Sequence, residues 1–128
     1  MILDASAIVA VFLREPGYDR VVDLLIGARG VGCGAPTLAE AGIVLSARLG
    51  TDARGLLGRF TQAFGVVEVP FGEDHWREAS RAFLVYGKGR HKAALDFGDC
   101  MAYATARLAG QPLLCTGRDF ARTDLELA

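Results

Sequence analysis

Four acidic residues lie where an apolar segment gives way to a helical pattern, a place where carboxylates can gather to bind metal ions. They are Asp4, Glu40, Asp99 and Asp119. One directly follows the apolar residues 1–3, and another follows residues 31–33 by a short turn. The third begins the helical pattern 97–109, and the fourth comes soon after the apolar residues 113–115. The chemistry of the four residues therefore depends on whether the fold brings these positions together.

Short apolar segments alternate with longer segments of helical periodicity along the whole chain. Strands are predicted at 1–3, 31–33, 66–69, 113–115 and 124–127, and helices at 6–13, 18–28, 38–49, 52–64, 74–86 and 97–109. This alternation predicts a single α/β domain over 1–128, a sandwich with a mainly parallel central sheet of about five short strands. Parallel strands end at the same edge of a sheet, so the four carboxylates are expected to converge there.

Carboxylates held close together repel one another, and a divalent cation would relieve that repulsion. Ligands that are all oxygen, with no paired His or Cys, favour Mg²⁺ or Mn²⁺ over zinc. Such a cluster suits hydrolysis of a phosphodiester, because divalent cations activate water and stabilise the departing oxygen. Whether one ion or two would bind stays open.

Helix capping is the alternative explanation for each acid taken singly. Thr37-x-x-Glu40 fits a capping box with Thr37 as N-cap, and similar spacings relate Asp96 to Asp99 and Thr116 to Asp119. Asp4 is hardest to explain in this way, because Ser6 is the better cap for the helix that follows. The joint pattern of four acids favours a metal site.

The chain resembles the PIN domain, and more narrowly a VapC-type toxin of a bacterial toxin–antitoxin system. Four segments, in this order and over nearly the whole chain, carry the resemblance: Met1-Ile2-Leu3-Asp4-Ala5-Ser6-Ala7, Pro36-Thr37-Leu38-Ala39-Glu40-Ala41, Leu95-Asp96-Phe97-Gly98-Asp99-Cys100-Met101-Ala102-Tyr103-Ala104 and Pro112-Leu113-Leu114-Cys115-Thr116-Gly117-Arg118-Asp119-Phe120. The resemblance implies a metal-dependent endoribonuclease that acts on structured RNA such as tRNA or rRNA. It also implies a doubly wound α/β sandwich, a homodimer, and inhibition by a cognate antitoxin that blocks the negative cleft with a basic side chain.

The resemblance also assigns individual residues. The metal-binding quartet becomes Asp4, Glu40, Asp99 and Asp119. Ser6 and Thr116 become hydroxyls that orient the carboxylates. Asp96 stands where many relatives have Asn, and we interpret it as a helix cap.

A basic, glycine-rich loop precedes the third motif and offers a second kind of site. Within residues 87–92, Arg90 and Lys92 are candidates for contacts with RNA phosphates. An ordinary solvated turn explains the same residues equally well. Lys92 also stands where related sequences often have Pro.

Composition excludes several classes of protein. A chain of 128 residues with 52% hydrophobic residues can fill a core, and it has no apolar run long enough for a membrane span. A net charge of −1 does not suggest a protein that coats nucleic acid by bulk charge. Three cysteines without a CxxC pair predict a reducing, cytoplasmic location rather than a disulfide framework.

Two other functions are compatible with the sequence. One is a catalytically silent PIN-like module that binds RNA or a protein. The other is a phosphoacceptor or phosphatase domain with Asp4 as nucleophile, although Ser6 stands where that chemistry usually needs a second Asp.

Overall fold

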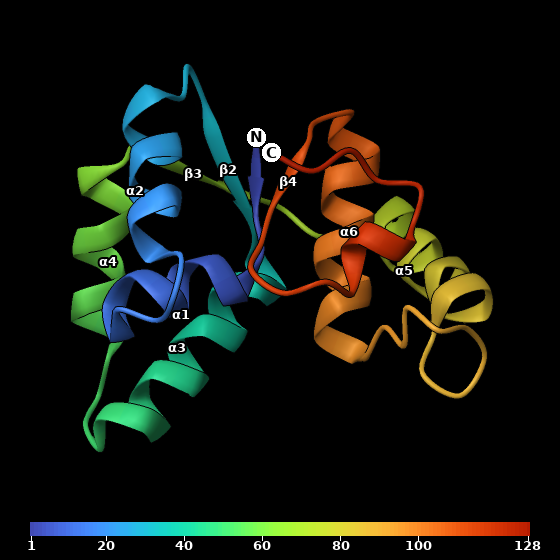
Figure 1. Ribbon diagram of the computed structural model, residues 1–128, viewed down its shortest axis with the longest axis horizontal. Helices are drawn as coiled ribbons and strands as arrows, with labels where there is room; N and C mark the ends of the chain where they lie inside the picture. Colours follow the sequence, from blue (N-terminus) through green and yellow to red (C-terminus); the bar gives the residue numbers. More distant parts are fainter.

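A parallel sheet separates two groups of helices (Figure 1), as the computed structural model of residues 1–128 shows. The strands are β1 (Ile2–Leu3), β2 (Val31–Gly34), β3 (Val66–Val69) and β4 (Leu113–Leu114), in the order β3-β2-β1-β4. The predicted α/β sandwich with a parallel sheet is confirmed. The predicted strand number of about five is wrong, since the sheet has four.

The helices divide between the two faces of the sheet. They are α1 (Ala5–Leu13), α2 (Tyr18–Gly27), α3 (Ala35–Leu49), α4 (Arg54–Ala63), α5 (Glu73–Tyr86) and α6 (Phe97–Ala109), followed by the 3₁₀ turn η1 (Phe120–Arg122). One core joins α1 to α4 to one face of the sheet, and a second core joins α5 and α6 to the other. Even the shortest strand serves both cores, because Ile2 packs in the second and Leu3 in the first.

The order of the strands reverses beside β1. From β1 the chain builds β2 and β3 outward on one side, and it then crosses to place β4 on the other side. Leu3 lies in register with Leu114, and the backbone N–H of Asp4 donates to the Leu114 carbonyl at 2.9 Å. The residues just after β1 and β4 are therefore neighbours at the switch point, where α/β sheets commonly bind ligands.

The predicted fifth strand, 124–127, is wrong because side chains hold this segment away from the sheet. Asp124 accepts hydrogen bonds from the Tyr103 hydroxyl at 2.7 Å and from Arg107 Nη1 at 2.8 Å, both on α6. Only the last residues reach the edge, where Leu127 forms a single bridge with Leu113. The edge of β4 is thus covered without a full strand.

Large apolar side chains that remain exposed are concentrated on α3, α5 and α6. They include Ile43, Leu84 and Phe97. On α2, Ile26 is exposed, whereas Leu57 and Phe60 of α4 are buried. None of the helices combines the length and apolar character needed to cross a membrane.

Candidate active site

Asp4 forms the centre of the candidate site and also caps α1. Its Oδ2 accepts hydrogen bonds from the Ser6 backbone N–H at 3.0 Å and from the Ser6 hydroxyl at 2.5 Å. The prediction that Ser6 is the better cap is therefore wrong, because the extended residue Asp4 holds the cap position and Ser6 lies inside the first turn. The Ser6 hydroxyl also accepts from the Thr116 backbone N–H at 3.0 Å. Thr116 therefore contacts Ser6 through its backbone amide, whereas the prediction concerned the Thr116 hydroxyl.

Glu40 projects from the second turn of α3 and does not cap it. The helix begins at Ala35, earlier than predicted, because Gly34 adopts the extended N-cap conformation and Pro36 fits the first turn. The predicted capping box with Thr37 as N-cap is therefore wrong. Glu40 instead packs against Gly98 of α6, where a Cβ atom would lie 2.6 Å from Glu40 Oε2. A side chain at position 98 would thus displace this carboxylate.

Thr37 is a buried residue to which the sequence assigned a different role. Only 1% of its surface is exposed, and its hydroxyl has no hydrogen-bond partner. It lies one turn before Glu40 on α3. The only signal in the sequence was its Thr-x-x-Glu spacing, which suggested a cap instead.

Asp99 and Asp96 form the capping box that their spacing predicted. Asp96 is the N-cap of α6, and its Oδ1 accepts from the Asp99 N–H at 2.9 Å. In return, Asp99 Oδ2 accepts from the Asp96 N–H at 3.0 Å. Capping therefore uses one oxygen of Asp99 and leaves Oδ1 without a protein donor.

The charges of Asp4 and Asp96 act on both Glu40 and Asp99. Burial, together with the charges of Asp4 and Asp96, raises the pKa of Glu40 to about 7. Burial raises the pKa of Asp99, and the charges of Asp96 and Asp4 add to the shift. Burial also raises the pKa of Asp4, against the opposing hydrogen bonds from Ser6. No ion pair neutralises any of these carboxylates.

Asp119 differs from the other three acids of the predicted quartet in its exposure. It is exposed, and it precedes η1 without forming a side-chain cap. Its charge helps to raise the pKa of Cys115, where burial is the main cause and the charges of Asp4 and Asp99 also contribute. Asp4 and Asp96 are the acids whose charges act on both Glu40 and Asp99.

The chemical nature of the acids suits a divalent cation, but their present arrangement does not form a metal site. The donors are carboxylate oxygens, those of Asp4, Glu40 and Asp99 are partly or fully buried, and no cationic side chain compensates them. However, no three His, Cys, Asp or Glu side chains converge closely enough to form a metal site. Binding a cation would require small side-chain rotations, for which Glu40 and the free oxygen of Asp99 are available.

The basic loop is an ordered turn that points its cations outward. Lys88 N–H donates to the Leu95 carbonyl at 2.9 Å, and Arg122 Nη1 donates to the Lys92 carbonyl at 2.9 Å. The Arg90 guanidinium lies 5.5 Å from the centre of the Phe83 ring. All three side chains of the loop's cations are exposed and form no ion pair with a carboxylate.

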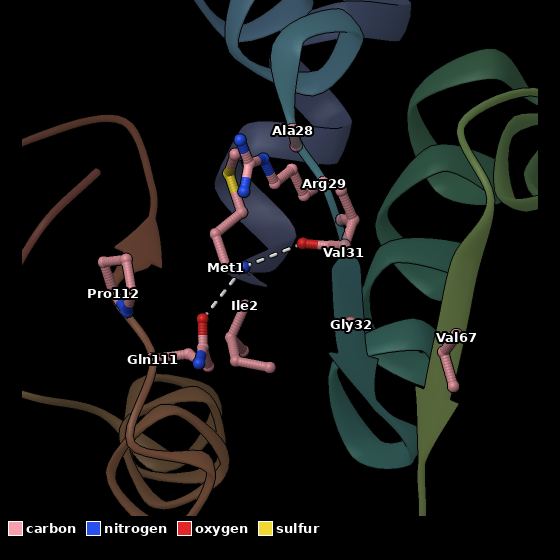
Figure 2. A pocket seen from close by; sticks show the side chains of 10 residues that line it. Met1, Ile2, Ala28, Arg29, Val31, Gly32, Val67, Gln111 and Pro112 are labelled. Atoms are coloured by element: carbon pink, nitrogen blue, oxygen red, sulfur yellow. Dashed lines mark hydrogen bonds between the residues drawn. The ribbon is translucent and has the colours of Figure 1, made fainter.

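A hollow of about 610 Å³ at the opposite end of the sheet is separate from the acids (Figure 2). It is lined near the starts of the strands by residues such as Met1, Val31 and Pro112. The Met1 amino group donates there to the Gly30 carbonyl at 2.9 Å and to Gln111 Oε1 at 3.5 Å. The hollow contains no acidic side chain, so it is not part of the candidate site.

Comparison with known proteins identifies the family. The PIN domain matches this chain over residues 1–126. The chain belongs to the PIN-domain family. Ribonuclease VapC36 of Mycobacterium tuberculosis is 50% identical over 127 residues, which cover 98% of this PIN domain and 91% of the relative. The VapC-type endoribonuclease inferred from the four motifs is therefore confirmed at the level of the family.

Solved structures share the fold of this PIN domain. The crystal structure of VapC20 from Mycobacterium tuberculosis, described as a toxin that cleaves the sarcin–ricin loop, superposes with a TM-score of 0.80 and 18% identity. It covers 99% of this chain and 97% of that one. A toxin–antitoxin complex from Klebsiella pneumoniae superposes with a TM-score of 0.72 at 14% identity, covering 99% and 95%.

Proposed function

We propose that this PIN domain hydrolyses RNA at the acidic site, with Asp4, Glu40 and Asp99 as the ligands of Mg²⁺ or Mn²⁺. One observation supports the proposal: three carboxylates from three different elements have raised pKa values, the charge of Asp4 contributes to the shifts of Glu40 and Asp99, and no cationic side chain pairs with any of them. If the acids had only a structural role, a cationic side chain paired with them would stabilise the fold. The chain provides no such side chain. The VapC relatives support RNA as the substrate.

Each acid has its own part in this mechanism. Ser6 fixes the Asp4 carboxylate, so this ligand is held in place before substrate arrives. Asp96 holds Asp99 through the capping box, while Glu40 is free to turn toward substrate or a water molecule. A bound divalent cation would supply Lewis-acid stabilisation of the phosphate and of the leaving oxygen. Asp119, on the exposed segment after β4, would complete the site or help to hold a second ion.

The basic loop would bind the RNA backbone beside the acids. Arg90 and Lys92 are unpaired cations, and the hydrogen bond from Arg122 to the Lys92 carbonyl joins the loop to the segment after β4. Cations placed near the acidic site would offset its repulsion of RNA phosphates. The loop would therefore position the substrate, while the acids carry out the reaction.

A cognate antitoxin and a second copy of the chain are the expected protein partners. The toxin–antitoxin complex with the same fold supports an antitoxin. A basic side chain of the antitoxin, inserted among acids that lack a cation, would neutralise them and exclude RNA. The exposed apolar residues of α3 and α5 are compatible with a homodimer.

The test is cleavage of total cellular RNA by the wild-type protein and by Asp4→Asn, with Mg²⁺, with Mn²⁺ and with EDTA. We expect cuts that require a cation and disappear in the mutant while the circular dichroism spectrum stays unchanged. Cleavage by a pure Asp4→Asn preparation would refute the assignment. RNA binding without cleavage by either protein would favour a silent binding module.

A phosphoacceptor role for Asp4 is disfavoured by its surroundings. Only 5% of Asp4 is exposed, and Oδ2 is already held by two hydrogen bonds from Ser6. A nucleophilic carboxylate needs an open approach to the phosphorus atom. Trapping with beryllium fluoride, with no adduct on Asp4, would separate this chemistry from metal-assisted hydrolysis.

A further inference from the structure

We propose that Phe97 stacks on an unpaired RNA base next to the phosphate that is cleaved. This inference rests on the proposed function and deepens it, because it names the form of RNA that the site accepts. Phe97 belongs to the third motif, and the sequence predicts no role for it.

Phe97 is exposed to an unusual degree for an aromatic residue at a candidate active site. It is the first residue of α6, and 81% of its surface is exposed, more than for any other large apolar residue of the chain. Its neighbours in sequence are Asp96, which caps the helix, and Gly98, which packs against Glu40. The apolar ring therefore lies in water beside the acids.

Two hollows in the surface meet at Phe97. One, of about 360 Å³, is lined by Phe97 together with Glu40, Gly98 and Met101. The other, of about 430 Å³, lies between α5 and α6 and is lined by Phe97 and Phe83, among others. Phe97 thus borders two hollows that are both largely apolar, and one of them is also lined by a proposed metal ligand.

This combination of groups matches a single-stranded nucleotide. A nucleotide has a flat base that stacks on aromatic rings and a phosphate that needs cations. The ring of Phe97 offers the first contact, and the acids with their cation would bind the phosphate. The exposed cations Lys88, Arg90 and Lys92 lie on the loop that leads into α6 and would bind the backbone beyond it. A protein partner would need the apolar surface but would not need these unpaired cations beside it.

The inference restricts the substrate to RNA that is unpaired at the cleaved position. In an A-form helix both faces of a base are covered by its neighbours, so the ring could not stack on it. A base in a loop, in a bulge or at an end can turn outward. Cleavage should therefore require an unpaired nucleotide beside the phosphate.

The test uses Phe97→Leu and Phe97→Trp in the Asp4→Asn background, which prevents cleavage during binding. The probe is a single-stranded RNA, taken from around a mapped cleavage site, with 2-aminopurine beside the cleaved position. We expect Phe97→Leu to lower affinity roughly 5- to 100-fold and to abolish quenching of the 2-aminopurine fluorescence. Phe97→Trp should retain both, since it preserves an aromatic face. Ile26→Ala, which removes the next most exposed large apolar side chain, on α2, should change neither.

Cleavage assays with an otherwise wild-type chain complete the test. Phe97→Leu should cut the single-stranded RNA more slowly, and annealing a complementary strand should suppress cutting by the wild-type protein. Equal binding, quenching and cleavage by wild type and Phe97→Leu would overturn the inference. It would also be overturned if Phe97→Leu altered only self-association or antitoxin binding, since Phe97 would then be a protein contact. The wild-type protein could cut no RNA and still bind it with quenching that depends on Phe97. That result would contradict the proposed nuclease activity, whereas the proposed stacking by Phe97 would stand.

Discussion

The Ser6 hydroxyl donates a hydrogen bond of 2.5 Å to the Asp4 carboxylate and accepts one of 3.0 Å from the Thr116 backbone N–H. A single side chain thereby joins the residue after β1 to the second residue after β4 across the switch point. It also holds the buried Asp4 in one orientation. The position of the proposed metal ligand is thus coupled to the loop that carries Asp119.

Ser6→Ala should therefore impair both activity and stability. The mutation removes a hydrogen bond to a buried carboxylate and leaves the Thr116 amide without its acceptor. We expect a loss of about 1–3 kcal/mol in the free energy of unfolding and at least a tenfold slower RNA cleavage. Urea unfolding and initial cleavage rates measure the two effects. Ser80→Ala, on the exposed face of α5, is the matched control and should leave both nearly unchanged.

Gly98→Ala should displace Glu40, because the added methyl group would lie 2.6 Å from Oε2. Alanine normally favours a helix, and the Glu40 carboxylate is the far end of a flexible side chain that can move aside, so the cost in stability should be small. We expect little change in the free energy of unfolding but weaker binding of Mn²⁺ in calorimetry. Gly58→Ala in α4 is the control, since nothing lies within 4 Å of its added Cβ, and it should stabilise the chain slightly. Equal metal binding by Gly98→Ala and the wild type would contradict a role for Glu40 as ligand.

Thr37→Val should raise the melting temperature of the protein without metal. Valine has nearly the same shape and removes a buried hydroxyl that has no partner. We expect a gain of about 1 kcal/mol or more, whereas Thr37→Ala should destabilise the chain by leaving a cavity. Differential scanning calorimetry in EDTA measures both. A lower melting temperature for Thr37→Val would show that the hydroxyl is satisfied, for instance by a buried water molecule.

The stability of the protein without metal should fall as the pH rises from about 4.5 to about 7. Glu40 binds its proton more tightly in the folded chain than in the unfolded chain, so in this window the folded state carries more protons. A divalent cation would bind the ionised form and should therefore stabilise the chain more at pH 8 than at pH 5. Thermal unfolding with EDTA or Mg²⁺ at several pH values measures this. In Glu40→Gln, both the loss of stability and the gain from the cation should be smaller.

Arg90→Ala should weaken RNA binding and reduce its dependence on salt. The Arg90 guanidinium is exposed and unpaired with any carboxylate, so it is free to bind a phosphate. Loss of one phosphate contact lowers the slope of log K against log salt by about 0.7 for a single strand. Fluorescence anisotropy between low and high salt measures the slope. Arg59→Ala on α4, also without an ion pair, provides the comparison, and an unchanged slope in Arg90→Ala would make the loop an ordinary turn.

The sequence alone determined the class of fold and predicted acids at the ends of its strands. Alternating short apolar segments and helical patterns predict a parallel sheet, and parallel strands place their following residues at one edge. Asp4, Glu40 and Asp99 were identified on this basis, because the relevant pattern is local and repeats along the chain. The capping box of Asp96 and Asp99 was equally local, and it was predicted correctly.

Only the tertiary structure decided which residues face one another. Glu40 meets Gly98 because α3 packs against α6, and Asp119 is left exposed just before η1. The burial of Thr37 and the exposure of Phe97 likewise depend on neighbours from distant parts of the chain. Periodicity and capping signals report on residues a few positions apart, whereas these contacts depend on how whole helices pack, which no local pattern specifies.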